Sequence, residues 1–197
     1  MSEKQNDDLS HVAFVVLGLV AEHPCHGKDI NKRIEDRGMR NWTAIGKSSI
    51  YGVLKTLKRK GLVESWVEEE DNRIVKIYQI TSEGNAAIEK RTYKILSEYN
   101  GRNDPDFYVA FSMLPGLPQH ARIEALTNSL IKIKESKQEL EKKLKEITHM
   151  PINVTGLFIH PIKTLQANIE FLTWVLKEIK DGGNLNGSEK KSSGFSS

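Results

Sequence analysis

The chain has 197 residues, of which 38% are hydrophobic and 28% are charged, with a formal net charge of +3 at pH 7. These values are typical of a soluble globular protein with one large domain or two small ones. The single cysteine, Cys25, excludes an intrachain disulfide and fits a reducing compartment. The N-terminus is polar, and the longest apolar run, residues 12–21, is half the length of a membrane span. We therefore expect neither a signal peptide nor a membrane span, and we expect the protein in the cytoplasm.

Two helices are predicted at the start of the chain. Residues 11–22 are apolar nearly all round, which indicates a buried helix, and Pro24 follows it. Residues 26–37 form the next predicted helix, with Ile30 and Ile34 on its inner side and Gly38 as its C-cap.

A one-sided basic helix is predicted next, with Ser48 or Ser49 as N-cap and an exit at Gly61. Its apolar residues follow helical spacing and should face a core: Ile50, Val53, Leu54 and Leu57. The opposite side carries Ser48, Tyr51, Lys55 and Lys58, and Arg59 and Lys60 extend the charge. Residues 37–63 contain seven Lys or Arg and no Asp or Glu, a pattern that suits a phosphate backbone. The alternative is an ordinary solvated helix face.

A two-stranded hairpin should follow this helix. Residues 62–67 and 74–80 are rich in β-branched and aromatic residues, and the polar residues 68–73 are predicted to form the turn. Residues 82–99 are helical again. Two helices, a basic helix, a hairpin and a further helix make a winged helix-turn-helix, so we expect a DNA-binding domain.

Residues 100–105 are rich in turn formers and mark a predicted domain boundary. We expect a winged helix-turn-helix domain over residues 1–99, a helical dimerisation domain over residues 100–182 and a disordered tail over residues 183–197. The overall fold class is mainly α.

In the second half, aliphatic residues recur at steps of three and four along two predicted helices, interrupted once by Lys137. Two such helices alone cannot cover both stripes, so we expect an antiparallel, coiled-coil-like helical domain that pairs with an identical subunit. The predicted dimerisation residues are Ile123, Leu126, Leu130, Ile133, Leu140, Leu144, Leu165, Ile169, Leu172 and Leu176. The alternative is a monomeric bundle that packs on the winged domain.

Four short motifs occur along the first half of the chain: Leu17-Gly18-Leu19 with Pro24, His26 and Gly27; Ser49-Ile50-Tyr51 with Leu54 and Leu57; Gly61-Leu62-Val63; and Tyr78-Gln79-Ile80-Thr81 with Gly84. Together they resemble the PadR-like family of bacterial transcriptional regulators. Lys28 and Gly52 depart from the Tyr and Pro that the family often has there. The resemblance implies a dimeric repressor that leaves its operator when a small molecule binds, with phenolic acids and flat aromatic drugs among the family's effectors.

Candidate DNA-binding residues follow from this arrangement. The first turns of the basic helix should enter the major groove, through Lys47, Ser48, Ser49, Tyr51 and Lys55. The flanking backbone should be clamped by Lys58, Arg59 and Lys60, and by Lys28, Lys32 and Arg40. Arg73 and Lys76 on the wing should approach the adjacent minor groove or its phosphates. Only the tip of the wing should touch DNA, because the acidic first strand would be repelled. Tyr51 has an alternative role in packing at the core edge. A dimer predicts an inverted-repeat operator with half-sites one or two turns of about 10 bp apart.

An effector pocket between the domains is a weaker hypothesis. It would be lined by the aromatic residues Trp42, Trp66, Phe107, Phe111 and Trp174, with Tyr108 and Phe171. Aromatic residues at helical spacing are more often plain core.

Two other classes of function stay open. A metal-responsive regulator would use His23, Cys25 and His26, although Pro24 makes joint chelation awkward. A protein-interaction adaptor would use the winged and coiled-coil parts as a scaffold, and an acidic or neutral helix face would favour it. No phosphate loop and no acid-base pair is evident, so we expect neither an enzyme nor a cofactor.

Overall fold

The computed structural model describes residues 9–43, 45–46, 50–70, 72–147 and 149–183. The elements are α1 (His11–Glu22), β1 (Cys25–His26), α2 (Gly27–Asp36), the 3-10 turn η1 (Met39–Asn41), α3 (Ile50–Arg59), β2 (Val63–Glu70), β3 (Arg73–Ile80), α4 (Ser82–Glu98), α5 (Pro105–Ser112), the 3-10 turn η2 (Leu114–Gly116), α6 (Gln119–Glu146) and α7 (Ile152–Lys180). The mainly helical fold class and the winged helix-turn-helix are confirmed. None of the described helices has the length and apolar character that crossing a membrane requires.

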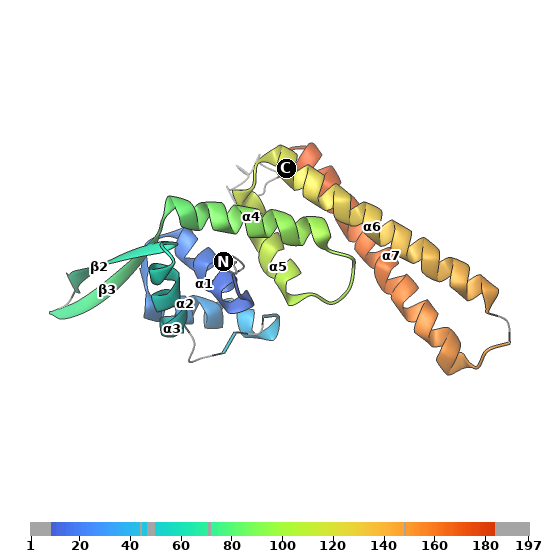
Figure 1. Ribbon diagram of the computed structural model, residues 1–197, viewed down its shortest axis with the longest axis horizontal. Coiled ribbons are helices and arrows are strands. Elements are labelled where there is room, and N and C mark those ends of the chain that lie inside the picture. The colour runs from blue at the N-terminus through green and yellow to red at the C-terminus, as the bar shows by residue number, and fades with distance from the viewer. Residues whose placement is uncertain (1–8, 44, 47–49, 71, 148, 184–197) are drawn as a thin grey trace, which may run out of the picture.

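The winged part lies at one end of the molecule and a long helical hairpin at the other (Figure 1). The ribbon of β2 and β3 projects from the body beside α3, and α6 and α7 run side by side away from it. The long α4 connects the two ends, because it starts at the base of the wing and packs against α5 and α6.

The sheet is antiparallel with strand order β1-β3-β2, so β3 is central and β2 is an edge strand. The register runs without a break from Val63 opposite Ile80 to Glu70 opposite Arg73. Sequence analysis placed the three glutamates 68–70 in the turn, but they belong to β2 and pair with β3. The wing is therefore longer than predicted, and Asn72 turns the chain at a φ of 59°. The two-residue β1 was not predicted.

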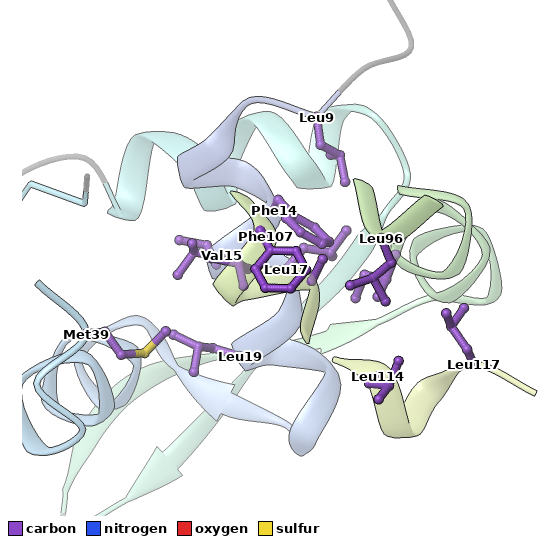
Figure 2. Close-up of a cluster of buried hydrophobic side chains, with 14 of the residues drawn as sticks. Leu9, Phe14, Val15, Leu17, Leu19, Met39, Leu96, Phe107, Leu114 and Leu117 are labelled. Carbon is purple, nitrogen blue, oxygen red and sulfur yellow. The ribbon is translucent and has the colours of Figure 1, made fainter. Parts of the chain in front are cut away.

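The core of the winged part is built around α1. Phe14, Val15, Val16 and Leu17 are fully buried, as the all-round apolar pattern predicted, and the Ser10 side chain caps the helix by accepting from the Ala13 amide. Figure 2 shows this cluster, in which α1 side chains meet Leu96 of α4 and Phe107 of α5. The same apolar core therefore joins the winged helices to α4 and α5.

A short hydrogen-bonded junction joins α3, the wing and α4. Gly61 ends α3 in the left-handed conformation, at a φ of 72°, which glycine adopts readily. The Thr81 hydroxyl accepts from the Gly84 amide, which caps α4, and donates to the Gly61 carbonyl at 2.7 Å. This one side chain fixes where α4 starts relative to the end of α3.

The helical half packs against α4 as well as against itself. The Ser129 hydroxyl of α6 donates to the Leu96 carbonyl, and the Asn168 side chain of α7 donates to the Gly101 carbonyl at 2.9 Å. Of the ten predicted dimerisation residues, Leu126, Ile133, Leu165, Leu172 and Leu176 are already buried within one chain. The other five, Ile123, Leu130, Leu140, Leu144 and Ile169, are half-buried. Lys137, the charged exception in the stripe, pairs with Glu141 at 2.8 Å.

Within one chain, the apolar stripes therefore pack α6 against α4 and α7, and the choice between a homodimer and a monomeric bundle stays a prediction. The predicted domain boundary falls just after α4 ends at Glu98, yet α4 contacts α6 closely. The division into two domains and a tail stays a prediction.

Two glycines provide a matched stability test of the junction. A Cβ at Gly84 would lie 2.1 Å from the Leu62 carbonyl oxygen, whereas a Cβ at Gly52 on α3 would meet nothing within 4 Å. We expect Gly84→Ala to lower the free energy of unfolding by about 1–3 kcal/mol, because overpacking must push α4 off the wing. Gly52→Ala should raise it by about 0.5–1 kcal/mol. Urea unfolding followed by circular dichroism measures both, and equal effects would contradict the close approach.

Candidate nucleic-acid interface

The candidate interface begins with α3, whose two sides differ sharply. On the inner side, Ile50, Leu54 and Leu57 are at most 1% exposed and pack in the core that α1 dominates. On the outer side, Lys55, Lys58, Arg59 and Lys60 are all exposed. Helical spacing predicted this division correctly. The described part of α3 contains no acidic residue, so its outer side is a cationic surface.

Three of the predicted groove residues, Lys47, Ser48 and Ser49, lie outside the described residues. Tyr51, in the first turn of α3, is 59% exposed. One edge of its ring lies against α2, because a Cβ at Gly27 would be 2.7 Å from Tyr51 Cε1. Tyr51 therefore packs on the start of α2 and also presents most of its surface to solvent.

The residues predicted to contact the DNA backbone differ in their exposure and in their partners. Lys28 and Lys32 on α2 are exposed. Arg40 differs, because its guanidinium pairs with Glu35 at 2.8 Å and donates to the Ile45 carbonyl at 2.7 Å. Arg40 thus holds the segment that leads into α3, a structural role that the sequence did not predict. Lys58 reaches the wing and donates to the Ser65 hydroxyl at 2.8 Å.

The wing has two unlike faces, because paired residues of an antiparallel ribbon share a face and successive residues alternate. We call the face that meets α3 the inner face; it carries Val63, Ser65, Val67 and Glu69 opposite Ile80, Tyr78, Lys76 and Ile74. The other, the outer face, carries Glu64, Trp66, Glu68 and Glu70 opposite Gln79, Ile77, Val75 and Arg73. The two predicted wing cations, Lys76 and Arg73, therefore lie on opposite faces.

Their surroundings differ accordingly. Lys76 shares the inner face with Ser65, and its Nζ lies 5.4 Å from the centre of the Tyr78 ring, over which a cation is favoured. Arg73 lies opposite Glu70 on the outer face. Of the two wing cations, Lys76 is therefore the one on the face that meets α3, and that face also carries Glu69. The period of two in β3 could have revealed this from the sequence.

The candidate metal ligands do not converge. Cys25 is 4% exposed and buried in the core, and His26, the next residue of β1, points to the opposite face and pairs with Glu70 at 3.2 Å. Burial raises the pKa of the Cys25 thiol, although Arg33 opposes this, so the metal-binding thiolate is disfavoured. Among the described residues, no three His, Cys, Asp or Glu side chains gather as a metal site.

The predicted aromatic pocket is not a single cluster. Phe107 and Phe111 of α5 continue through Phe171 to Trp174 of α7, with ring centroids 5.3–6.1 Å apart. Trp66 lies on the wing and Trp42 follows η1, so the five predicted residues do not line one cavity. Their shared residue type carried no information about position.

A pocket does occur elsewhere between the winged part and α5. Its volume is about 460 Å³, within the range of small-molecule sites. It is lined by α1, the α2–η1 segment, α4 and the α5–η2 segment, through Val15, Gly18, Leu19, Ala21, Glu22, Arg37, Met39, Asn85, Ile88, Glu89, Val109, Ser112, Met113, Pro115 and Gly116. No aromatic residue belongs to this lining, so a search for aromatic residues could not have found it.

The winged part of the chain is similar to a known protein family. Residues 16–90 match the model of the transcriptional regulator PadR-like family. A comparison with curated proteins found no match.

Among solved structures, Bacillus subtilis PadR in complex with operator DNA is 17% identical, with 85% of this chain and 98% of that chain covered and a TM-score of 0.38. The PadR-like transcriptional regulator BC1756 from Bacillus cereus is 21% identical, with 91% and 99% covered and a TM-score of 0.38. The protein smu.1604c from Streptococcus mutans UA159 is 17% identical, with 88% and 98% covered and a TM-score of 0.40.

These identities and TM-scores are low, so the assignment rests on the family model. That model covers α2, α3, the whole sheet, most of α1 and the first half of α4. The quoted motifs lie within it, and they include both the inner side of α3 and the wing junction at Gly61, Thr81 and Gly84. Over residues 16–90, the chain is therefore similar to the PadR-like family of transcriptional regulators.

Proposed function

We propose that the protein is a sequence-specific regulator of transcription that binds double-stranded DNA as a homodimer. The observation that carries this proposal is the rigidly backed cationic side of α3, with Lys55, Lys58 and Arg59 exposed and Ile50, Leu54 and Leu57 buried behind them. A helix held in this way can enter the major groove, whose width admits an α-helix. An acidic or neutral face here would favour the adaptor alternative, and this face is basic.

In the proposed complex, the first turns of α3 approach the base edges, with Tyr51 foremost among the described residues. Lys58 and Arg59 near the end of α3 contact phosphates, which position the protein without reading sequence. The inner face of the wing, with Lys76, follows the backbone beside the groove. Lys28 and Lys32 on α2 supply further phosphate contacts.

The proposed dimer uses apolar surface that one chain leaves uncovered in the helical half. Large apolar side chains are exposed on α5, α6, α7 and the α6–α7 connection: Tyr108, Ile131, Met150, Ile152, Leu157, Ile159 and Trp174. Ile152 and Leu157 are 90% and 73% exposed, so they gain most from a partner. A second copy of the chain is the occupant we propose, since two-fold pairing covers the same surface on both copies. Two winged parts would then meet an inverted-repeat operator in the cytoplasm.

We further propose that the protein is a repressor and that a small effector releases it from DNA. The pocket of about 460 Å³ is the supporting feature, since it lies where α1 and α4 meet α5. A ligand in this pocket can change the position of the helical half relative to the winged part. Because a dimer must hold both α3 helices at a fixed spacing, such a change would weaken DNA binding. The largely aliphatic lining of the pocket suits a small apolar or aromatic body.

The DNA proposal is tested by removing two cations of α3. Lys55→Ala with Lys58→Ala should weaken binding to a duplex selected by the protein from a random-sequence library. Each lost phosphate contact should also flatten the slope of log K against log salt by roughly 0.9, so the pair should remove about 1–2 units. Fluorescence anisotropy over a salt series measures both quantities.

The matched control is Lys142→Ala with Lys143→Ala, two exposed lysines in the last turns of α6. The hairpin of α6 and α7 lies at the end of the molecule opposite the wing (Figure 1). The control removes the same charge and should leave the slope as in the wild type. An unchanged slope in the α3 variant, or an equal loss in the control, would show that α3 is not the DNA-binding helix.

The effector proposal is tested by filling the pocket. Ala21 is an exposed residue of α1 that lines the pocket, so Ala21→Phe should fold and bind DNA while leaving less room for a ligand. With a panel of phenolic acids as probes, we expect at least one to release wild-type protein from DNA and to require roughly 10-fold more for Ala21→Phe. Ala167→Phe on α7, outside the pocket, is the control. Release that Ala21→Phe does not alter would place the effector site elsewhere.

A further inference from the structure

The outer face of the wing carries a charge opposite to that of the outer side of α3, whereas the inner face carries one acid, Glu69, beside Lys76. Glu64, Glu68 and Glu70 occupy alternate positions of β2 on this face, and all three are exposed. Arg73 is the one cation that β2 and β3 place beside them, and it lies opposite Glu70. These carboxylates would repel phosphates, although the wing is proposed to lie beside DNA.

Two of the three carboxylates, Glu68 and Glu70, are held by local contacts. The Trp66 indole nitrogen donates to Glu68, and Glu70 pairs with His26 of β1 at 3.2 Å. The face therefore keeps a fixed position relative to α3, which contacts the inner face through Lys58 and Ser65. When α3 and Lys76 meet a duplex, the outer face is turned to the other side of the ribbon.

Because its two faces carry different charges, the wing binds DNA differently depending on which face is turned toward the phosphates. Non-specific complexes are held mainly by phosphate charge and let a protein adopt many orientations and slide. Orientations that bring the outer face against phosphates put like charges together, and such repulsion is a recognised source of specificity. The specific complex, which turns this face away, avoids most of that cost.

We propose that Glu64, Glu68 and Glu70 are specificity-determining residues that lower the affinity for non-specific DNA while affecting the operator complex little. This inference rests on the DNA binding proposed above. It gives the acidic strand of the wing a function, whereas its charge would otherwise only weaken binding.

The test is the triple variant Glu64→Gln, Glu68→Gln and Glu70→Gln. Glutamine keeps the side-chain length and can still accept from Trp66, so only the charge is lost. Affinities are measured for a selected duplex and for a scrambled duplex of the same length and base composition. We expect binding to the scrambled duplex to tighten on the order of 10-fold at low salt, and binding to the selected duplex to tighten clearly less.

Two controls separate position from net charge and from damage to the wing. The first control changes the net charge by the same amount at three exposed positions of α6, through Glu135→Gln, Glu139→Gln and Glu146→Gln. It should leave the affinities for the selected and the scrambled duplex unchanged. Glu64→Asp, Glu68→Asp and Glu70→Asp retain the charge and should keep the wild-type ratio of the two affinities.

The outcomes are distinguishable. The inference is overturned if the wing variant tightens both duplexes equally, tightens neither, or is matched by the α6 control. If the wild-type protein selects no duplex and binds DNA with no salt dependence, the proposed function itself fails.

Discussion

The burial of one side of α3 is the constraint on which the rest of the structure depends. Ile50, Leu54 and Leu57 are inserted into the core around α1. Burying each of these side chains stabilises the fold by about 1.5–3 kcal/mol relative to leaving it exposed. A rotation of α3 that turned its lysines inward would expose all three, so the helix has one stable orientation. The cations on its outer side are presented to solvent as a consequence of this apolar packing, and Lys58 is further placed by its hydrogen bond to Ser65.

The same packing orients the wing and the helical half. Lys58 contacts β2 through Ser65, and Thr81 joins the end of α3 to the start of α4. From there α4 runs through the core to α6, where Leu96 accepts from Ser129. A continuous set of contacts therefore links the recognition surface to the part of the chain in which a dimer is proposed. The pocket lies along this path, at the meeting of α1, α4 and α5.

Sequence patterns predicted most of the architecture but less of the site. Helical spacing identified both sides of α3, and the bounds expected for α1 are those observed, because hydrophobic periodicity follows directly from helix geometry. The wing was placed correctly but drawn too short, since a run of glutamates is a poor strand former and was taken for a turn. Pairing along β3 overrides that local preference, and β1 exists only through the same pairing.

Long-range contacts account for what the sequence did not predict. Arg40 counted as one of seven cations in a basic stretch, yet its bonds to Glu35 and Ile45 give it a structural role. The aliphatic stripe on α6 predicted a partner, and the chain itself supplies part of it through α4 and α7. The aromatic residues expected to line a pocket lie on separate elements, because composition does not report which elements meet.

The central claim is that α3 and the inner face of the wing together form the DNA surface. It is tested most directly by placing a photoreactive phenylalanine at one position at a time and irradiating the complex with a selected duplex. Tyr51 and Val67 are exposed on α3 and on the inner face, while Trp66, adjacent in sequence, lies on the outer face. We expect DNA crosslinks from positions 51 and 67 and none from position 66. Crosslinking from position 66, or none from position 51, would contradict the account.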